Sequence, residues 1–222
     1  MTSSNPPNPL PKGTLQQRMA AKANACGGSY EILLAPWKRK LFGDLHGNIL
    51  EIGPGAGPNL AYFPADAHWL GVEPNPASVQ YLQQAIRRLE RPAENYRIDP
   101  GDAHGKILPV DDASQDAVVC SLVLCSATRP RELMSEIVRV LKPGGRFAFI
   151  EHVAAPRGTR LRTLQNLITP LSILFEDGCR PNRETWTTIF DAGFERVEIE
   201  HFQIKPGILG VPFIAGWAEK AV

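Results

Sequence analysis

A run of glycines beside an acidic residue is the most informative feature of the sequence. The segment Glu51-Ile-Gly-Pro-Gly-Ala-Gly57 ends an apolar stretch in a carboxylate and then places glycines at alternate positions, Gly53, Gly55 and Gly57. Glycine adopts the backbone angles that a tight turn requires, and its missing side chain lets a ligand approach the backbone. Ligands of open α/β sheets bind outside the carboxyl ends of the strands, so we expect this turn to bind a ligand.

The spacing of the glycines discriminates between cofactors. A dinucleotide-binding turn follows the pattern G-x-G-x-x-G, but here the third glycine comes one residue early and Pro58 occupies the expected position. The phosphate-binding pattern G-x-x-x-x-G-K-[ST] does not occur in the chain. Glu51 would repel a pyrophosphate but suits the cationic amino group of a bound amino acid. A cofactor that contains an amino acid is therefore expected, and a nicotinamide-dependent dehydrogenase is the weaker alternative.

Two further acidic residues follow predicted strands. Glu73 can accept hydrogen bonds from both hydroxyls of a ribose, as acids do in nucleoside-binding Rossmann sites. Asp102, in the segment Gly101-Asp102-Ala103, can accept a hydrogen bond from the exocyclic amine of adenine. Because the carboxyl ends of parallel strands meet at one edge of a sheet, these acids and Glu51 are expected to surround one ligand. The combination predicts a site for the methyl donor S-adenosylmethionine.

Strands and helices alternate along the chain from Asn48 onward. We expect strands at 48–52, 69–73, 96–98, 116–124, 146–153, 194–202 and 213–218. Helices are expected from about residue 58, at 78–89, at 130–141, at 160–175 with a break at Pro170, and at 183–192. This alternation predicts an α/β fold with a parallel sheet and right-handed crossovers.

Composition limits the classes of partner. The 222 residues carry a formal net charge of +1, which gives no reason to expect a nucleic-acid partner. The polar, Pro-rich N-terminus has neither a signal-peptide core nor a membrane-spanning stretch, so a cytoplasmic location is expected. The four cysteines form no C-x-x-C pair, which argues against a metal site and fits a reducing compartment.

Several motifs together resemble a known family. Glu51–Gly57, Glu73, Gly101–Ala103 and Leu141-Lys-Pro-Gly-Gly145 resemble the class I S-adenosylmethionine-dependent methyltransferases. A closer similarity, to the methyltransferase-like thiol S-methyltransferases, rests on Lys38–Phe42, Asn75-Pro76, Val119–Ser126, Glu151–Ala154, Asp177–Cys179 and Arg183–Trp186. The resemblance covers about residues 40–220 and implies a Rossmann-like, seven-stranded, mostly parallel sheet with helices on both faces and an antiparallel last strand.

Composition and residue patterns predict the domain organisation. Residues 1–13 are expected to be a disordered tail, 14–46 an N-terminal helical cap broken at Gly27-Gly28 and Pro36, and 47–222 the methyltransferase domain. Animal members of the family carry a membrane-anchoring segment at the N-terminus, whereas the N-terminus here is polar. Peripheral membrane contact and the oligomeric state stay open at this point.

The resemblance also implies roles for individual residues in binding S-adenosylmethionine. The glycines of the turn would contact its methionine part, Glu73 would bind the ribose, and Asp102 with Ala103 would flank the adenine. Ser121 and Leu122 would lie beside the methyl group. The expected cofactor set is Glu51, Gly53, Gly55, Gly57, Glu73, Pro74, Asp102, Ala103, Ser121 and Leu122.

The acceptor side is less fully specified. His152 ends a predicted strand at the ligand-binding edge and is the expected catalytic proton acceptor, because histidine titrates near pH 7. Glu151 is the second candidate, although a solvated or ion-paired role is the alternative for it. Tyr30, Trp37 and Cys125 are expected to line the acceptor site, and packing in the core is the alternative for each.

The resulting hypothesis is an enzyme that methylates the thiol of a small apolar molecule. A thiol with a pKa near 8.5 ionises partly at neutral pH and therefore needs only modest help from a base. The enzymatic alternative is N- or O-methylation of a phospholipid headgroup, a quinone or a specialised metabolite. A protein that binds the cofactor and regulates a partner without turnover is the non-enzymatic alternative.

Overall fold

The computed structural model describes residues 13–25, 29–101, 107–176, 178–205 and 210–222. Helices and strands alternate over most of these residues. In chain order they are α1 (Leu15–Ala25), α2 (Ser29–Phe42), β1 (Asn48–Ile52), η1 (Leu60–Tyr62), β2 (His68–Val72), α3 (Pro76–Arg88), η2 (Ala93–Asn95), β3 (Tyr96–Asp99), β4 (Gln115–Ser121), α4 (Pro130–Val140), β5 (Leu141–His152), α5 (Arg160–Phe175), α6 (Thr185–Phe190), β6 (Arg196–Ile204) and β7 (Val211–Glu219).

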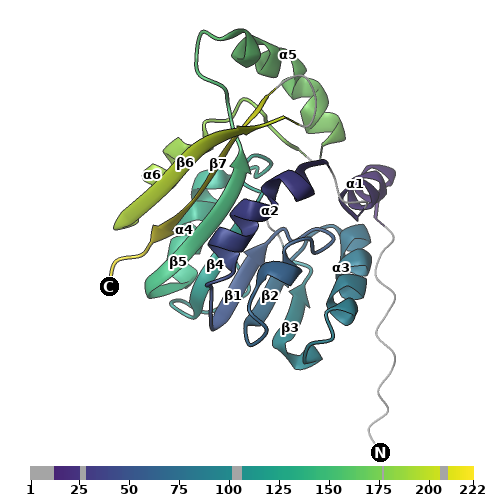
Figure 1. The fold of residues 1–222 in the computed structure, drawn as a ribbon, viewed down its shortest axis with the longest axis vertical. Helices are drawn as coiled ribbons and strands as arrows, with labels where there is room; N and C mark the ends of the chain where they lie inside the picture. The colour runs from purple at the N-terminus through teal and green to yellow at the C-terminus, as the bar shows by residue number, and fades with distance from the viewer. Residues whose placement is uncertain (1–12, 26–28, 102–106, 177, 206–209) are drawn as a thin grey trace, which may run out of the picture.

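A seven-stranded sheet in the order β3-β2-β1-β4-β5-β7-β6 forms the centre of the molecule (Figure 1). The pairs among β1 to β5 are parallel, and β7 runs antiparallel to both β5 and β6. The predicted Rossmann-like architecture, with its antiparallel last strand, is therefore confirmed. Since the strand order reverses at β1, the crevice between β1 and β4 is the place where such sheets bind ligands.

Burial explains which strands are central. Four of the five residues of β1, from Ile49 to Ile52, are buried, and β4 is also buried over most of its length. Continuous burial is typical of parallel strands that helices cover on both faces. Strand β6 instead alternates half-buried and exposed residues at the sheet edge. The two patterns match the uninterrupted and the alternating apolar runs in the sequence.

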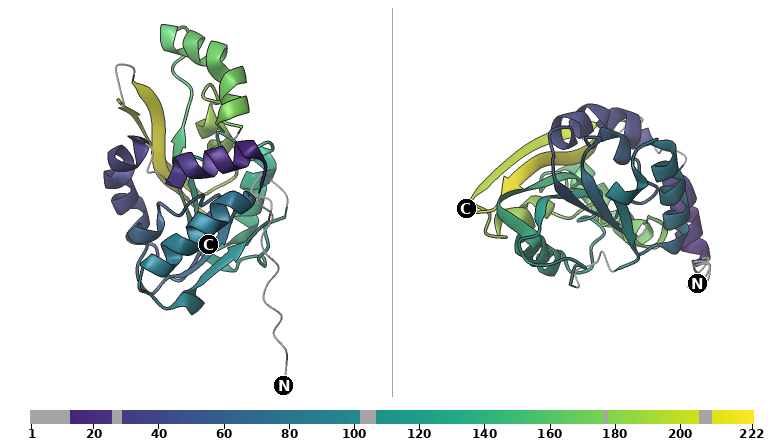
Figure 2. Two further views of the ribbon diagram at one scale, coloured as in Figure 1. Left: turned by 90° about the vertical axis from the view of Figure 1, so that its right-hand side faces the viewer. Right: turned by 90° about the horizontal axis from the view of Figure 1, so that it is seen from below.

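Helices cover both faces of the sheet (Figure 2). On one face, α4 presents Leu133, Met134, Ile137 and Val140 to a core that also contains Ile189 of α6. On the other face, Leu34 and Phe42 of α2 pack in a second core with Leu82 of α3. Apolar residues three and four positions apart form one face of a helix, which is why these segments cover the sheet. No helix among the described residues is both long and apolar enough to cross a membrane.

Two predicted helix breaks are wrong. Helix α2 continues through Pro36 and α5 continues through Pro170. A proline inside a helix removes one N–H donor, which in α5 would have pointed to the carbonyl of Asn166. Asn166 is exposed, so water can satisfy that carbonyl. The Gly27-Gly28 break and the tail before residue 13 lie outside the described residues.

Three other predictions differ from the structure at their boundaries. The helix expected from residue 58 is only the short 3₁₀ turn η1, because Pro64 follows it closely. Strand β4 ends at Ser121 rather than at residue 124, since Leu122 adopts a left-handed conformation with φ of 62°. Strand β5 begins at Leu141, but its pairing with β4 jumps from Leu141 to Arg146, so the Lys-Pro-Gly-Gly segment bulges.

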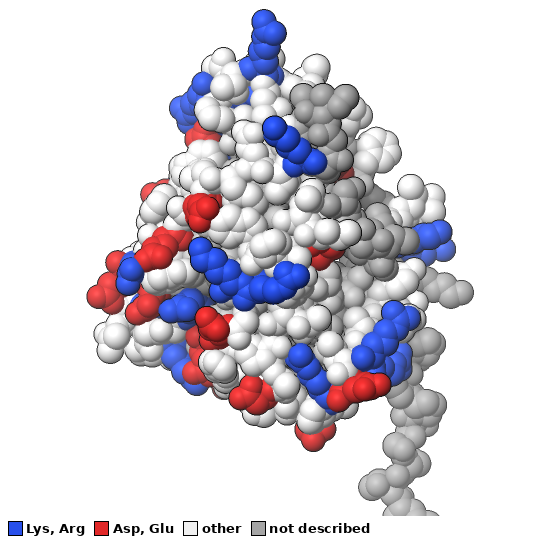
Figure 3. Space-filling model, in the orientation of Figure 1, with Lys and Arg blue, Asp and Glu red and all other residues white. Residues whose placement is uncertain are grey.

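Helix α5 projects beyond the carboxyl ends of the parallel strands (Figure 1). In the same orientation, lysine, arginine, aspartate and glutamate side chains are interspersed over the lower part of the molecule, whereas most of the charged side chains in the upper part, around α5, are basic (Figure 3). The exposed large apolar residues of α5 are Leu164, Leu167, Ile168, Leu171, Leu174 and Phe175. The space between α5 and the strand ends contains the candidate site.

Candidate active site

A cavity of about 640 Å³ opens at the carboxyl ends of β1, β2, β4 and β5. The strand ends supply a polar side that includes Gly53, Gly55, Glu73 and Ser121. Helix α5 supplies a mostly apolar side that includes Leu164, Ile168 and Phe175. The site thus joins two chemically different halves. Such a division suits a polar cofactor next to an apolar second substrate.

The glycine turn after β1 has the left-handed backbone conformation that its glycines allow. Gly53, Gly55 and Gly57 have φ values of 62°, 58° and 86°, in the left-handed region that favours glycine. A Cβ atom on Gly53 would lie 2.9 Å from Cγ2 of Val123, so this glycine lets the turn approach the loop after β4. Gly57 does not line the cavity, because a Cβ there would meet Leu60 and Leu82. Its role is close packing of the turn against the helices.

Glu73 fixes the shape of the turn from the neighbouring strand. Its two carboxylate oxygens accept hydrogen bonds from the backbone N–H groups of Gly55 (2.7 Å) and Asn75 (2.8 Å). Glu73 and Pro74 both line the cavity, and their assignment to the nucleoside part of the cofactor stays a prediction. A carboxylate oxygen can accept more than one hydrogen bond, so a diol can also bind there. Asn75 in turn caps α3 by accepting from the N–H of Ala77 (3.0 Å).

Glu51 does not reach the cavity. Its carboxylate lies under the turn, where it accepts hydrogen bonds from Asn59 Nδ2 (2.7 Å) and Trp69 Nε1 (2.9 Å). Burial raises the pKa of Glu51 to about 7, although both hydrogen bonds oppose the shift. The expected contact with a ligand amino group is therefore not what this structure shows. Asn59 lines the cavity instead, and it had no recognisable signal in the sequence.

The loop after β4 is held by Glu151 of β5. The backbone N–H groups of Val123, Leu124 and Cys125 all donate to this carboxylate, at 3.0, 3.0 and 3.2 Å. Burial raises the pKa of Glu151 to about 7, against the effect of these hydrogen bonds. Glu151 is thus neither solvated nor ion-paired, which corrects the alternative considered for it. Since it does not line the cavity, its role is to position the loop.

That loop brings several predicted residues to the cavity. Ser121, Leu122 and Cys125 all line it. The left-handed conformation of Leu122 turns the chain at the end of β4, and its N–H donates to the carbonyl of Ile150 (2.8 Å). Asp102 and Ala103, expected near the adenine, lie outside the residues that the structure describes.

His152 lines the cavity one residue after Glu151. Its ring stacks on Phe213, with centroids 5.5 Å apart, and its Nδ1 lies 3.8 Å from Sγ of Cys179. The sulfur of Cys179 lies 3.8 Å from that of Cys125. Cys179 was not predicted as a site residue, although it ends one of the segments that carry the family resemblance.

The two aromatic residues expected at the acceptor site have different surroundings. Tyr30 lines the cavity with its ring centroid 5.7 Å from that of Phe213, and burial raises its pKa. Trp37 is outside the lining and stacks on Phe202 with a centroid distance of 4.5 Å. Packing, the alternative considered for Trp37, is what the structure shows.

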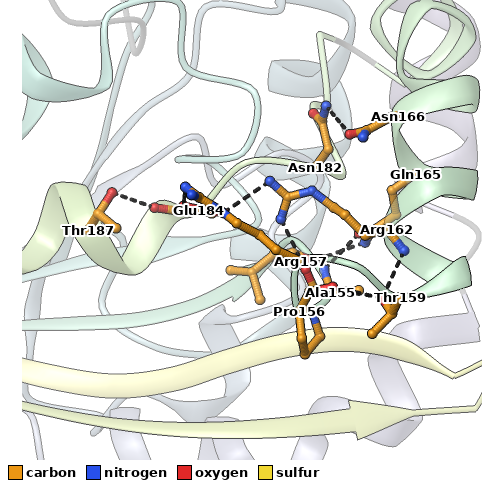
Figure 4. Close-up of polar contacts among 11 residues, drawn as sticks. Ala155, Pro156, Arg157, Thr159, Arg162, Gln165, Asn166, Asn182, Glu184 and Thr187 are labelled. Atoms are coloured by element: carbon orange, nitrogen blue, oxygen red, sulfur yellow. Dashed lines mark hydrogen bonds and ion pairs between the residues drawn. The ribbon is translucent and has the colours of Figure 1, made fainter.

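A polar network anchors the apolar wall (Figure 4). Glu184, just before α6, accepts from Arg157 (2.8 Å) and from Arg162 at the start of α5 (3.0 Å). The buried side chain of Gln165 accepts from the N–H of Ala155 (2.7 Å) and donates to the carbonyl of Val153 (3.1 Å). These bonds fix α5 relative to the end of β5 and therefore fix the width of the cavity.

Comparisons with known proteins identify the kind of site. A family model described as "Methyltransferase domain" matches residues 50–149. The thiol S-methyltransferase TMT1A of Homo sapiens is 33% identical over 199 residues, which cover 82% of this chain and 80% of that protein. The thiol S-methyltransferase TMT1B of Rattus norvegicus is 37% identical over 174 residues, covering 73% and 69%. The chain belongs to the thiol S-methyltransferase family.

This methyltransferase uses S-adenosylmethionine as methyl donor, as predicted, which sets aside the dehydrogenase and the purely regulatory alternatives. The crystal structure of the [4+2]-cyclase SpnF shares the fold, with a TM-score of 0.71 at 17% identity, and covers 96% of this chain and 98% of its own. That similarity concerns the fold alone. The matched residues 50–149 include the glycine turn, Glu73 and the loop after β4, but not His152, α5 or Cys179.

Proposed function

We propose that this enzyme transfers the methyl group of S-adenosylmethionine to the thiol of a small apolar molecule. The single observation that carries the proposal is the cavity that connects the glycine turn with the apolar wall of α5 beside His152. Two relatives that share most of the chain bear the name thiol S-methyltransferase. A cavity with one largely apolar side suits an acceptor that is itself apolar.

The polar half of the cavity fits the cofactor. Glu73 and Pro74 would hold the ribose, and Gly53, Gly55, Ser121 and Leu122 would border the methionine part. A side chain on Gly53 would collide with Val123, so the glycine leaves the backbone of the turn open to the cofactor. When bound, S-adenosylmethionine supplies a methyl group on a positively charged sulfur. Asp102 and Ala103 stay assigned to the adenine as a prediction.

The apolar half would hold the acceptor. Leu164, Ile168 and Phe175 form the wall that would exclude water, and Tyr30 and Cys125 would border the acceptor from α2 and the loop after β4. Holding a nucleophile in line with the methyl group can supply roughly 7–11 kcal/mol of the barrier in well-oriented systems. The wall would supply this alignment for an apolar group better than for a charged headgroup.

His152 would take the proton of the acceptor thiol. It is the histidine in the cavity lining, and stacking on Phe213 fixes the plane of its ring. A thiol with a pKa of about 8.5 is mostly protonated at pH 7, so a base increases the fraction of nucleophilic thiolate. We also propose a reducing, cytoplasmic setting, which the free thiols of Cys120, Cys125 and Cys179 support.

The acceptor class is tested with a panel of small molecules and radiolabelled methyl donor. Alkyl and aryl thiols are expected to be methylated, and matched phenols, amines and phosphoethanolamine are expected to give at least about tenfold lower kcat/KM, a difference of about 1.4 kcal/mol in transition-state stabilisation. Turnover should rise with the chain length of the alkyl thiol, because the wall is apolar. Equal or faster turnover of a phenol or an amine would overturn the thiol assignment in favour of O- or N-methylation.

A further inference from the structure

Two cysteines from distant parts of the chain meet in the cavity wall. Cys125 belongs to the loop after β4 and Cys179 follows α5, and their sulfurs are 3.8 Å apart. Both are free thiols, only 2% and 8% exposed, and both line the cavity. The N–H of Arg180 donates to the carbonyl of Cys125 (3.1 Å), which ties the two segments together. A reagent that reaches these sulfurs must therefore enter the cavity.

The surroundings make the two thiols chemically different. Hydrogen bonding to Cys125 and to His152 lowers the pKa of Cys179 to about 6, although burial opposes the shift. The pKa of Cys125 is raised well above its usual value by the contact with Cys179 and by burial. Cys179 therefore ionises more readily than Cys125, which makes Cys179 the better nucleophile of the pair. This is the arrangement of an attacking and a resolving cysteine.

We propose that Cys179 and Cys125 form a thiol–disulfide exchange site that accepts the disulfide form of the acceptor thiol. This inference rests on the proposed function only for the choice of disulfide: R–S–S–R is the oxidised form of the proposed acceptor thiol, R–SH. The sulfurs lie in the same cavity as the glycine turn and the apolar wall, so an apolar disulfide fits where the thiol fits. No group of three or more metal-ligating side chains occurs in the described parts of the chain, which favours covalent chemistry over metal binding.

The exchange proceeds in two balanced steps. The thiolate of Cys179 attacks one sulfur of R–S–S–R, the S–S bond breaks, R–S⁻ leaves and a mixed disulfide forms on Cys179. The thiol of Cys125 then gives up its proton to the departed thiolate and attacks Sγ of Cys179, which releases a second R–S⁻. Two electrons pass from the cysteine pair to the acceptor, leaving a Cys125–Cys179 disulfide, one R–SH and one R–S⁻.

The products are substrates for methylation. Both R–S groups are released inside the cavity that we assign to the acceptor, next to His152. The oxidised cysteine pair must be reduced by two equivalents of a low-molecular-weight thiol before it can react again. An oxidised acceptor therefore reaches the methylation site without prior reduction in solution.

The test uses the full-length reduced protein, freed of reductant, with 2,2′-dithiodipyridine and no methyl donor. This apolar disulfide releases the chromophore 2-thiopyridone. Every protein tested also carries Cys26→Ala, which removes the remaining cysteine outside the pair and the core. The parent protein should release two equivalents in a fast phase, lose the mass of two hydrogen atoms and yield a Cys125–Cys179 peptide. Cys125→Ser should release one equivalent and retain a mixed disulfide on Cys179. Cys179→Ser should slow the fast phase at least about tenfold.

Cys120→Ala is the matched control. Cys120 is fully buried in the core and does not line the cavity, so this variant should keep the fast phase. A fast phase that survives in Cys179→Ser, or a peptide map of the parent protein without the Cys125–Cys179 bond, would overturn the proposal. The peptide map is made on protein that keeps both Cys125 and Cys179, so this result does not depend on whether the variants of these two residues fold. Because this test contains no methyl donor, it is independent of the acceptor panel. Failure of the exchange with successful thiol methylation would remove only the exchange proposal. Successful exchange with no thiol methylation would remove only the thiol assignment.

Discussion

At the scale of single residues, His152 and its neighbour Glu151 have different positions relative to the cavity. His152 contacts Phe213 and Cys179 and faces the cavity, whereas Glu151 beside it is buried under the loop after β4. Two adjacent residues at the end of one strand thus have different roles, because successive side chains of a strand point to opposite faces. Glu151 positions the loop after β4, and His152 lines the cavity where we propose that it accepts the proton of the acceptor thiol.

Replacing His152 by Asn should lower kcat/KM for a thiol about 10²-fold near pH 7, a typical loss for a general base. The deficit should shrink as the pH rises past about 8.5, because the acceptor thiol then ionises unaided. Initial rates of both enzymes between pH 6 and 9.5 give the ratio of their kcat/KM values as a function of pH. His201→Asn is the control, since His201 lies on β6 against Trp186 and outside the cavity lining. A pH-independent deficit would assign His152 a positioning role instead.

At the scale of elements, α5 is the part of the cavity wall that depends on polar anchoring. It carries large exposed apolar residues, some of which line the cavity, and its first turn is joined to the segment before α6 by Glu184. Hydrogen bonds from Arg157 and then Arg162 lower the pKa of Glu184 to about 2. Arg162 is only 17% exposed at its side chain, so its pairing is screened less by solvent than that of Arg157.

Replacing Glu184 by Gln should reduce stability by about 1 kcal/mol at neutral pH. The folded pKa is below the unfolded one, so the contribution is present above about pH 4.5 and is lost as the pH falls towards 2. Urea denaturation of both proteins between pH 3 and 7 should show curves that converge in acid. Glu132→Gln, which breaks the exposed Arg129–Glu132 pair, is the control and should be near neutral. A constant offset at every pH would contradict the ion-pair explanation.

For the whole molecule, two buried carboxyls make stability depend on pH near neutrality. Burial raises the pKa of both Glu51 and Glu151 to about 7. At these two groups the folded state therefore holds more protons than the unfolded chain between about pH 4.5 and 7, and their contribution to stability falls as the pH rises through this window. The acid groups that shape the active site thus make the fold less stable when they ionise.

Glu51→Gln and Glu151→Gln should each flatten the loss of unfolding free energy between pH 5 and 8, by on the order of 1 kcal/mol. Every histidine is kept in both variants, so the difference from wild type isolates the carboxyls. Each glutamine also loses one accepted hydrogen bond, which lowers stability at all pH values by roughly 1 kcal/mol without changing the slope. Parallel curves for wild type and variants would show that neither carboxyl titrates in this range.

The sequence by itself determined the sheet, its order of alternating elements and the strand ends at which the polar half of the cavity lies. Apolar runs, glycine spacing and strand-end acids are local signals, and a parallel sheet brings strand ends such as Gly53, Glu73 and Ser121 to one edge. What a local pattern cannot encode is the direction of a side chain relative to distant segments. Only the tertiary structure shows that Glu51 is buried in a hydrogen bond with Trp69 and that α5 stays helical through Pro170. It also places Cys179 beside Cys125, which is 54 residues away in the sequence.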